Sequence, residues 1–235
     1  CANPPRAKPI CRTSAWRLAG ACDPCDPCDP CDNSRYGNAA VTLALCDSED
    51  SRAAWPYAFL LALTVTLGPG LLRLDCVVKN TGSAPYTFTA ALHTYLRCDD
   101  VHRVRLVGLD GCPYEDALDD NRTRMQPEEA LRVAGEIDRV YPAAPATLCL
   151  TADETAGDST PEMMLRQYGF EDWVVWNPGP AKAAALTDMP QADWQHMLCV
   201  ESGQIAKPVH LAPDASWRAG VSLKAVAPMY REAQA

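Results

Sequence analysis

Short apolar stretches recur along most of the chain, separated by glycine and proline, and this spacing constrains the fold more than any other feature. Examples are AAVTLALC (39–46), YAFLLALTVTLGPG (57–70) and DWVVWNPG (172–179). Stretches of this length and composition, bounded by turn residues, are typical of β-strands. They do not alternate with long helical patterns, which argues against a doubly wound parallel sheet. About a dozen such strands predict an all-β fold, an antiparallel β-sandwich or barrel.

The connections between these strands are also predicted. LLRLDCVVKN (71–80) and TFTAALHTYL (87–96) flank NTGSAP (80–85), which we interpret as a hairpin-type connection. The segment ALRVAGEIDRVYP (130–142) is expected to form another pair of strands. Only PGPAKAAALTDMPQADW (178–194) carries enough alanine and leucine to predict short helices. We expect a single β-sandwich domain over residues 1–235.

Charge and hydropathy exclude some classes of partner. The net charge is −9 and the predicted pI is about 4.9, and no block of basic residues stands out. Nucleic acid is therefore not expected as a partner. The longest apolar run is interrupted by threonines and is shorter than the roughly 18 residues needed to span a bilayer, so no membrane association is expected. We expect a monomer that binds a small molecule.

Twelve cysteines raise the question of a disulfide framework. Those after residue 31 lie singly, as in LDCVV around Cys76 and MLCVE around Cys199. In such surroundings cysteine usually behaves as a small buried hydrophobe. We therefore predict a reducing compartment, the cytoplasm, or a plastid if a targeting segment precedes Cys1.

The repeat CDPCDPCDPCD (22–32) has cysteines at every third position, a spacing that overlaps that of zinc and iron–sulfur ligands. Metal sites usually take their ligands from two separated turns, whereas this repeat is periodic and of low complexity. Proline at every third position also forbids a helix or a central strand. We interpret residues 22–32 as a loop insertion and assign no metal ligands.

His93 lies in a strand-like stretch, FTAALHTYL (88–96). Alternation places it on the same face as Thr87, Thr89 and Tyr95, which offer hydroxyl groups rather than an apolar surface. A lone histidine on a strand is more often a hydrogen-bonded structural residue than a catalyst. Its polar face makes His93 a candidate for acid–base chemistry.

Glu201 follows the apolar stretch MLCV (197–200) and precedes Ser202-Gly203, where we expect a bend. Burying a carboxylate there costs free energy unless the group is paired or used. Burial would also raise its pKa toward neutrality, as suits a general base. The alternative is that Glu201 ends the strand in solvent.

Five segments resemble, in order and spacing, the glucose-6-phosphate 1-epimerases, or hexose-6-phosphate mutarotases, of the aldose 1-epimerase group. They are AALHTYL (90–96), VGLDGCPYEDAL (107–118), GEIDRVY (135–141), VVWNPGPAKAAALTDMP (174–190) and WQHMLCVESGQI (194–205). The resemblance extends from about Arg12 to Leu223 and implies a galactose mutarotase-like antiparallel β-sandwich.

The resemblance also implies roles for individual residues. His93 and Glu201 match the family's catalytic histidine and glutamate. Asp138 matches a ligand of the sugar hydroxyls, and Tyr95 is predicted to contact the substrate beside His93. Arg12 matches an arginine that is a candidate for the phosphate, because a guanidinium group fits phosphate geometry.

The N-terminus departs from the family pattern. Lys8-Pro9-Ile10-Cys11 replaces the family's His-Gly-Phe-Ala before the arginine, and the family's first strands, with an Arg-Gly-Gly segment that helps to hold the phosphate, have no counterpart. We therefore expect a chain truncated or spliced at its N-terminus, with the catalytic pair retained.

The resemblance implies interconversion of the α and β anomers of a hexose 6-phosphate by acid–base ring opening, without a cofactor. The first alternative is a non-catalytic carbohydrate-binding domain, the remnant of an epimerase. The second is a glycoside hydrolase, which would need two carboxylates facing one sugar, and Glu201 with Asp138 is the only plausible pair.

Overall fold

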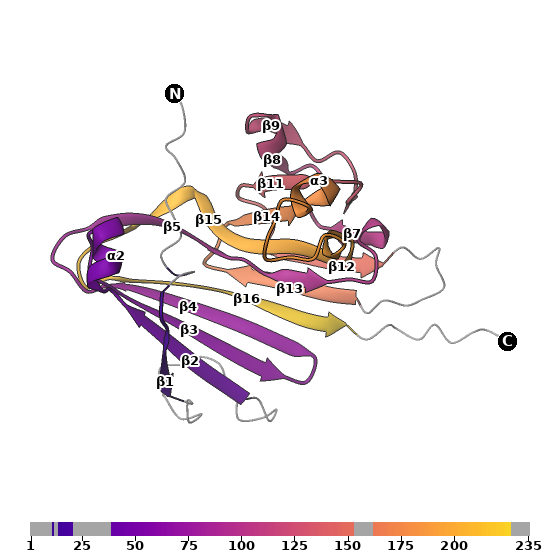
Figure 1. The fold of residues 1–235 in the computed structure, drawn as a ribbon. Helices are drawn as coiled ribbons and strands as arrows, with labels where there is room; N and C mark the ends of the chain where they lie inside the picture. The colour runs from indigo at the N-terminus through magenta and orange to yellow at the C-terminus, as the bar shows by residue number, and fades with distance from the viewer. Residues whose placement is uncertain (1–10, 12–13, 21–38, 153–161, 227–235) are drawn as a thin grey trace. The chain divides into compact units, whose positions relative to one another are not determined.

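The computed structural model describes residues 11, 14–20, 39–152 and 162–226, and more than half of these residues lie in antiparallel strands (Figure 1). Contacts divide the chain into two compact units. Unit 1 comprises Cys1–Pro69, Leu74–Thr87 and His210–Arg218. Unit 2 comprises Gly70–Arg73, Phe88–Val209 and Ala219–Ala235. The prediction of an all-β antiparallel fold is confirmed.

Unit 1 is built on an antiparallel sheet in the order β1-β2-β3-β4. Its elements are β1 (Arg17–Gly20), β2 (Ala39–Cys46), α2 (Glu49–Ala54), β3 (Phe59–Gly68) and β4 (Leu71–Asn80). The predicted turn at Gly-Pro-Gly joins β3 to β4, with Gly70 at a φ of +65°, which a residue without a Cβ adopts at little cost.

Helix α2 was not predicted. Ser48 caps it, because its hydroxyl accepts from the backbone N–H of Ser51, while the Ser51 hydroxyl accepts from the backbone N–H of Ser48. Glu49 and Asp50 occupy the first turn, where carboxylates favour the positive end of a helix. The sequence CDSEDSRAA thus carried a capping signal that strand periodicity alone could not detect.

Unit 2 contains two sheets. The first has the order β16-β13-β12-β7-β10, and the second the order β5-β15-β14-β11-β8-β9, with β6 also pairing with β15 (Figure 1). The strands are β5 (Tyr86–Leu92), β6 (Tyr95–Arg97), β7 (Val104–Val107), β8 (Pro113–Asp116), β9 (Arg122–Met125), β10 (Ala130–Arg132), β11 (Ile137–Tyr141), β12 (Thr147–Ala152), β13 (Glu162–Tyr168), β14 (Asp172–Asn177), β15 (Met197–Leu211) and β16 (Ser216–Val226).

Short helical segments connect some of these strands. They are η2 (Val101–Arg103), η3 (Ala117–Asp119), α3 (Gly179–Ala183) and η5 (Asp193–His196). Helix α3 lies within the stretch predicted to be helical, 178–194, and η5 begins in it, so the prediction of short helices there is confirmed. Gly179 at the start of α3 has a φ of +59°, and a Cβ there would lie 2.7 Å from the backbone nitrogen of Glu136.

The core of unit 2 is formed by residues of both sheets that are fully buried. They include Leu106, Leu148 and Leu165 of the first sheet and Trp173, Val175 and Val200 of the second. Burial of such side chains stabilises a fold by roughly 1.5–3 kcal/mol each. This apolar layer fixes the second sheet as a rigid support for groups on its other face.

Two predicted strand pairs are wrong. The strands that flank NTGSAP, β4 and β5, belong to different sheets, and so do β10 and β11 of ALRVAGEIDRVYP. At the first connection, the side chain of the buried Asn80 donates hydrogen bonds to the backbone oxygens of Ala84 and Leu211. Its amide therefore holds a loop that leads to another sheet, where we expected a hairpin turn.

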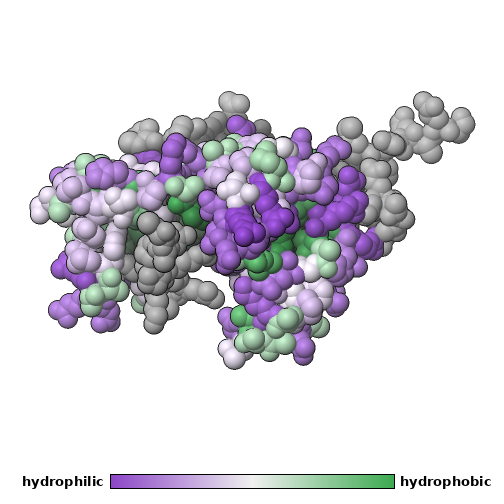
Figure 2. Space-filling model, turned by 90° about the horizontal axis from the view of Figure 1, so that it is seen from above, coloured by the Kyte–Doolittle hydropathy of each residue, from purple (hydrophilic) through white to green (hydrophobic). Residues whose placement is uncertain are grey.

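Hydrophilic residues cover most of the face in Figure 2, and hydrophobic residues form small patches among them. The large exposed hydrophobic side chains include Leu18, Leu67, Tyr95 and Met125. Within the described residues, no helix is long and apolar enough to cross a membrane.

Candidate active site

Strand β14 is the element around which the candidate site is organised. Its sequence DWVVWN is apolar on both faces, and most of it is buried, as expected for a central strand. Asp172 at its start accepts from the backbone N–H groups of Ile205 and Ala206, and Asn177 at its end donates to the backbone oxygen of Met197. Both ends of β14 therefore fix the position of β15.

A row of cross-strand neighbours crosses the second sheet of unit 2. Asp138 of β11 lies opposite Trp176 of β14, Trp176 lies opposite Cys199 of β15, and Cys199 lies opposite Tyr95 of β6. Residues directly opposite each other in antiparallel strands share a face. Glu201 is two residues after Cys199 and therefore lies on this face too. Three predicted site residues, Tyr95, Asp138 and Glu201, are thus brought to one face by the register of four strands.

His93 reaches the same face from a bend. Strand β5 ends at Leu92 and β6 begins at Tyr95, so the continuous strand that we expected is interrupted at His93. The backbone N–H of Thr94 donates to the oxygen of Leu92 at 2.9 Å, which closes a tight turn centred on His93. The predicted alternation before the bend is confirmed, because Thr87, Thr89 and Ala91 are exposed.

His93 and Glu201 form a close pair. The Nε2 atom of His93 lies 3.4 Å from Oε1 of Glu201. The imidazole is 45% exposed, whereas the carboxylate is only 8% exposed. The alternative that Glu201 ends its strand in solvent is therefore wrong. The arrangement gives a buried proton acceptor next to a proton donor that a ligand can reach from solvent.

Two aromatic rings fix the imidazole. The ring of Tyr95 stacks on His93 with centroids 4.8 Å apart and an interplanar angle of 13°. Trp176 presents its edge, with its centroid 6.0 Å from that of His93. Tyr95 is 54% exposed, so it offers an accessible aromatic surface beside the pair. We did not identify Trp176 from the sequence, because only the strand register places it next to His93.

Cys199 lies beside this pair. Its side chain is fully buried and its thiol is free. Burial, and secondarily the charge of Glu201, raise the pKa of the Cys199 thiol well above its usual range. The thiol is therefore protonated at neutral pH and is no nucleophile. The donor atoms of His93, Cys199 and Glu201 lie within 4.8 Å of one another, which makes them a group able to hold a metal ion.

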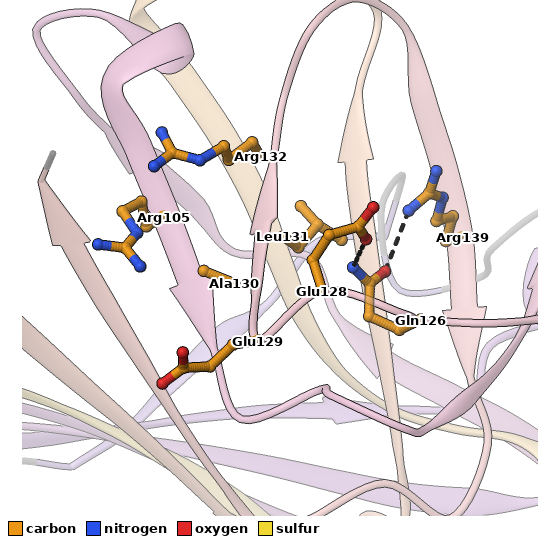
Figure 3. Close-up of a pocket in the computed structure, with 8 residues that line it drawn as sticks. All are labelled: Arg105, Gln126, Glu128, Glu129, Ala130, Leu131, Arg132 and Arg139. Atoms are coloured by element: carbon orange, nitrogen blue, oxygen red, sulfur yellow. Dashed lines mark hydrogen bonds between the residues drawn. The ribbon is translucent and has the colours of Figure 1, made fainter.

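A second polar cluster lies elsewhere in unit 2 and lines a cavity of about 380 Å³ (Figure 3). Gln126 is its centre, because its Oε1 atom accepts from Tyr141 Oη at 2.9 Å and from Arg139 Nη1 at 3.2 Å, and its Nε2 atom donates to Glu128. Arg139 also lies over the ring of Tyr114, 4.3 Å from its centroid. These groups satisfy one another, so we assign them a structural role.

The remaining predictions fall on residues outside the described ranges. They concern Arg12, the candidate for phosphate binding, and the repeat CDPCDPCDPCD (22–32). The nearby Trp16 donates from Nε1 to the backbone oxygen of Cys11. The seven cysteines of the described residues, including Cys76 and Cys98, form no disulfide bond.

Comparison with known proteins connects this chain with one family. The aldose 1-epimerase family profile matches residues 29–224. A proposed glucose-6-phosphate 1-epimerase from Cenchrus ciliaris is 35% identical over 199 residues, covering 83% of this chain and 59% of the relative. A proposed glucose-6-phosphate 1-epimerase from Escherichia coli is 27% identical over 181 residues, covering 74% of this chain and 58% of the relative.

Solved structures show the same fold. A proposed mutarotase from Salmonella typhimurium matches with a TM-score of 0.77 at 22% identity, covering 92% of this chain and 66% of that chain. The predicted galactose mutarotase-like β-sandwich is thereby confirmed. The chain spans a little under three fifths of the length of the curated relatives it matches.

Proposed function

This chain belongs to the aldose 1-epimerase family, and from that premise we propose that it interconverts the α and β anomers of hexose 6-phosphates. His93 and Glu201 act as the acid–base pair. The specific substrate that we infer, glucose 6-phosphate, is the sugar phosphate in the names of the relatives from Cenchrus ciliaris and Escherichia coli.

The reaction needs two proton transfers, at two oxygen atoms that are bonded to the same carbon atom. Glu201 removes the proton of the anomeric hydroxyl while His93 donates a proton to the ring oxygen, so that the bond between C1 and the ring oxygen breaks and an aldehyde forms. Rotation about the C1–C2 bond exposes the other face of the aldehyde. The C5 hydroxyl then attacks that face, with the roles of acid and base reversed. Each transfer of this kind typically accelerates a reaction by about 10²- to 10⁴-fold.

The observation that carries this proposal is the distance of 3.4 Å between His93 Nε2 and Glu201 Oε1. The anomeric oxygen and the ring oxygen are bonded to the same carbon, so the groups that serve them must lie close together. A glycoside hydrolase would instead use two carboxylates, several ångströms apart, as its acid and base. The partner of Glu201 at short distance is an imidazole, which favours the mutarotase.

The neighbouring residues suit sugar binding. Tyr95 offers an exposed ring, and apolar C–H faces of sugars pack against such rings. Asp138 shares the face of Glu201 and carries a carboxylate that can accept from sugar hydroxyls. We propose that both contact the sugar and that Arg12 contacts its phosphate.

The test is the rate of anomer exchange of glucose 6-phosphate, measured by magnetisation-transfer NMR on the full chain. We expect Glu201→Gln to remove most of the enzymatic exchange. Glu171→Gln is the matched control, because Glu171 is an exposed glutamate that pairs with Lys207 at 3.7 Å and lies outside the His93–Glu201 pair. A wild-type rate in Glu201→Gln would remove Glu201 from the mechanism.

A second candidate is a non-catalytic sugar-binding domain. It is favoured by the exposed ring of Tyr95, which can bind a sugar without any proton transfer. Wild-type protein that binds glucose 6-phosphate in a calorimetric titration without accelerating anomer exchange would establish this alternative.

A further inference from the structure

The cluster of His93, Cys199 and Glu201 combines three kinds of metal-binding atom in a small volume. An imidazole nitrogen, a thiol sulfur and a carboxylate oxygen lie within 4.8 Å of one another. In tetrahedral zinc sites, bond lengths of about 2.0–2.3 Å place ligand atoms roughly 3.3–3.8 Å apart. The nitrogen and the oxygen, 3.4 Å apart, already have this separation. The sulfur, at most 4.8 Å from the other two atoms, needs to approach them by about 1.3 Å at most.

The donor set selects the class of cation. Calcium and magnesium take oxygen ligands almost exclusively, whereas zinc accepts nitrogen, sulfur and oxygen together. Three protein ligands leave a fourth position for water. The half-exposed imidazole lies on the solvent side of the cluster and the buried thiol on its inner side, so an ion enters past His93.

We propose that His93, Cys199 and Glu201 form an inhibitory site for Zn²⁺ or a similar thiophilic divalent cation. Binding replaces the proton of the Cys199 thiol by the metal, and this proton leaves to solvent. The metal occupies His93 Nε2 and a Glu201 oxygen, which are the atoms that carry protons in the proposed anomerisation. The ion therefore competes with the sugar. The inhibitory part of this inference rests on the proposed function, whereas the binding of the ion does not.

The position of Cys199 separates metal binding from catalysis. Its side chain is fully buried and has no role in the proposed proton transfers. We therefore expect Cys199→Ser to retain the basal rate of anomer exchange while losing the response to zinc. Cys98→Ser is the matched control, because Cys98 is also a buried free cysteine of unit 2 but lies outside the cluster.

The experiment is a calorimetric titration of the full chain with ZnCl₂ in the absence of sugar. The cysteines of the repeat, Cys22, Cys25, Cys28 and Cys31, are a second potential set of zinc ligands. All four are therefore changed to serine in each protein that is titrated. We expect one zinc ion per chain in this background and in Cys98→Ser. Loss of a supporting residue beside a metal ligand typically weakens binding by 10- to 100-fold, so Cys199→Ser, which removes a ligand itself, should weaken it by about tenfold or more.

A second variant guards against a folding defect at the buried position. His93→Gln changes a half-exposed side chain on a bend and should weaken zinc binding by a similar factor. Inhibition is then measured as the increase of KM for glucose 6-phosphate with zinc concentration, reversed by a chelator. Unchanged zinc affinity in folded Cys199→Ser or in His93→Gln would overturn the metal site. The two proposals can fail separately. If both variants weaken zinc binding but the wild-type chain shows no anomer exchange, the metal site is supported and the proposed function is contradicted.

Discussion

Two polar clusters of unit 2 differ in how far the groups at their centres are exposed to solvent: Gln126 is 2% exposed, whereas the side chain of His93 is 45% exposed. In the cluster around Gln126, one amide oxygen accepts from both Tyr141 and Arg139, and the amide nitrogen donates to Glu128. In the cluster around His93, a buried carboxylate faces an imidazole that is 45% exposed. Strand β11 contributes to both faces of its sheet, because Asp138 and Arg139 are consecutive and point to opposite sides. Asp138 lies on the face of Glu201, and Arg139 donates to Gln126.

The comparison separates groups that hold the fold from groups that can act on a ligand. A buried hydrogen-bond network stabilises one arrangement, and removal of one member leaves the others without partners. An acid–base pair open to solvent on one side can instead exchange protons with a bound molecule. Changes in the His93 cluster should therefore alter catalysis, and changes in the Gln126 cluster should alter stability.

The largest effect is expected from the catalytic pair. His93→Ala and Glu201→Gln should each lower the enzymatic rate of anomer exchange by about 10²- to 10⁴-fold, because each removes one proton transfer. Circular dichroism and thermal melting should show a folded protein. His210→Ala is the control for the histidine, because His210 is an exposed residue that contacts Thr87. A folded His93→Ala protein at the wild-type rate would contradict the comparison.

The reverse pattern is expected for Gln126→Leu. The change removes the acceptor of Tyr141 and Arg139 at a position that is 2% exposed, and we expect a loss of about 3 kcal/mol in the free energy of unfolding. Urea denaturation measures this loss, and kcat for glucose 6-phosphate should stay within about twofold at a temperature where the variant is folded. A loss of kcat well beyond twofold in the folded variant would place the Gln126 cluster in the mechanism.

The phosphate contact can be tested separately from the sugar contact. A charge-assisted hydrogen bond contributes roughly 1.5–3 kcal/mol, so Arg12→Ala should weaken binding of glucose 6-phosphate by about tenfold or more. Glucose binding should change much less, and the difference should shrink at high salt. Calorimetric titrations of both sugars measure this. Equal affinity of the wild-type chain for glucose and glucose 6-phosphate would instead favour the sugar-binding alternative.

The smallest effect concerns alkaline pH. Burial raises the pKa of Tyr141 to about 12, above the value of about 10 expected in an unfolded chain. The contribution of Tyr141 to the free energy of unfolding is complete below pH 10, where the phenol is protonated in both the folded and the unfolded chain. This contribution is lost as the pH rises from about 10 toward 12. By pH 11 we expect a loss of about 1 kcal/mol from this residue.

Tyr141→Phe should flatten that pH dependence, because phenylalanine has no ionisable group. Urea denaturation of wild type and variant at pH 9 and pH 11 provides the comparison. The same slope in both proteins would show that Tyr141 does not control the alkaline transition.

Much of the local structure was determined by the sequence alone. Strand-length apolar stretches with glycine and proline between them predicted the antiparallel fold, and alternation correctly placed Thr87, Thr89 and Ala91 on one face, which the structure shows to be exposed. These predictions succeed because side-chain direction along a strand depends only on local geometry. The resemblance to the epimerases also identified His93 and Glu201, which the structure brings within 3.4 Å.

Only the tertiary structure decided which strands are neighbours. The connection NTGSAP resembles a hairpin, yet Asn80 holds it as a loop between two sheets. The row from Asp138 through Trp176 and Cys199 to Tyr95 likewise depends on the register of four strands. Pairing of strands far apart in sequence is set by burial of the whole core and is not encoded in any one segment. The proximity of Trp176 and Cys199 to His93 and Glu201 is therefore evident only from the assembled sheet.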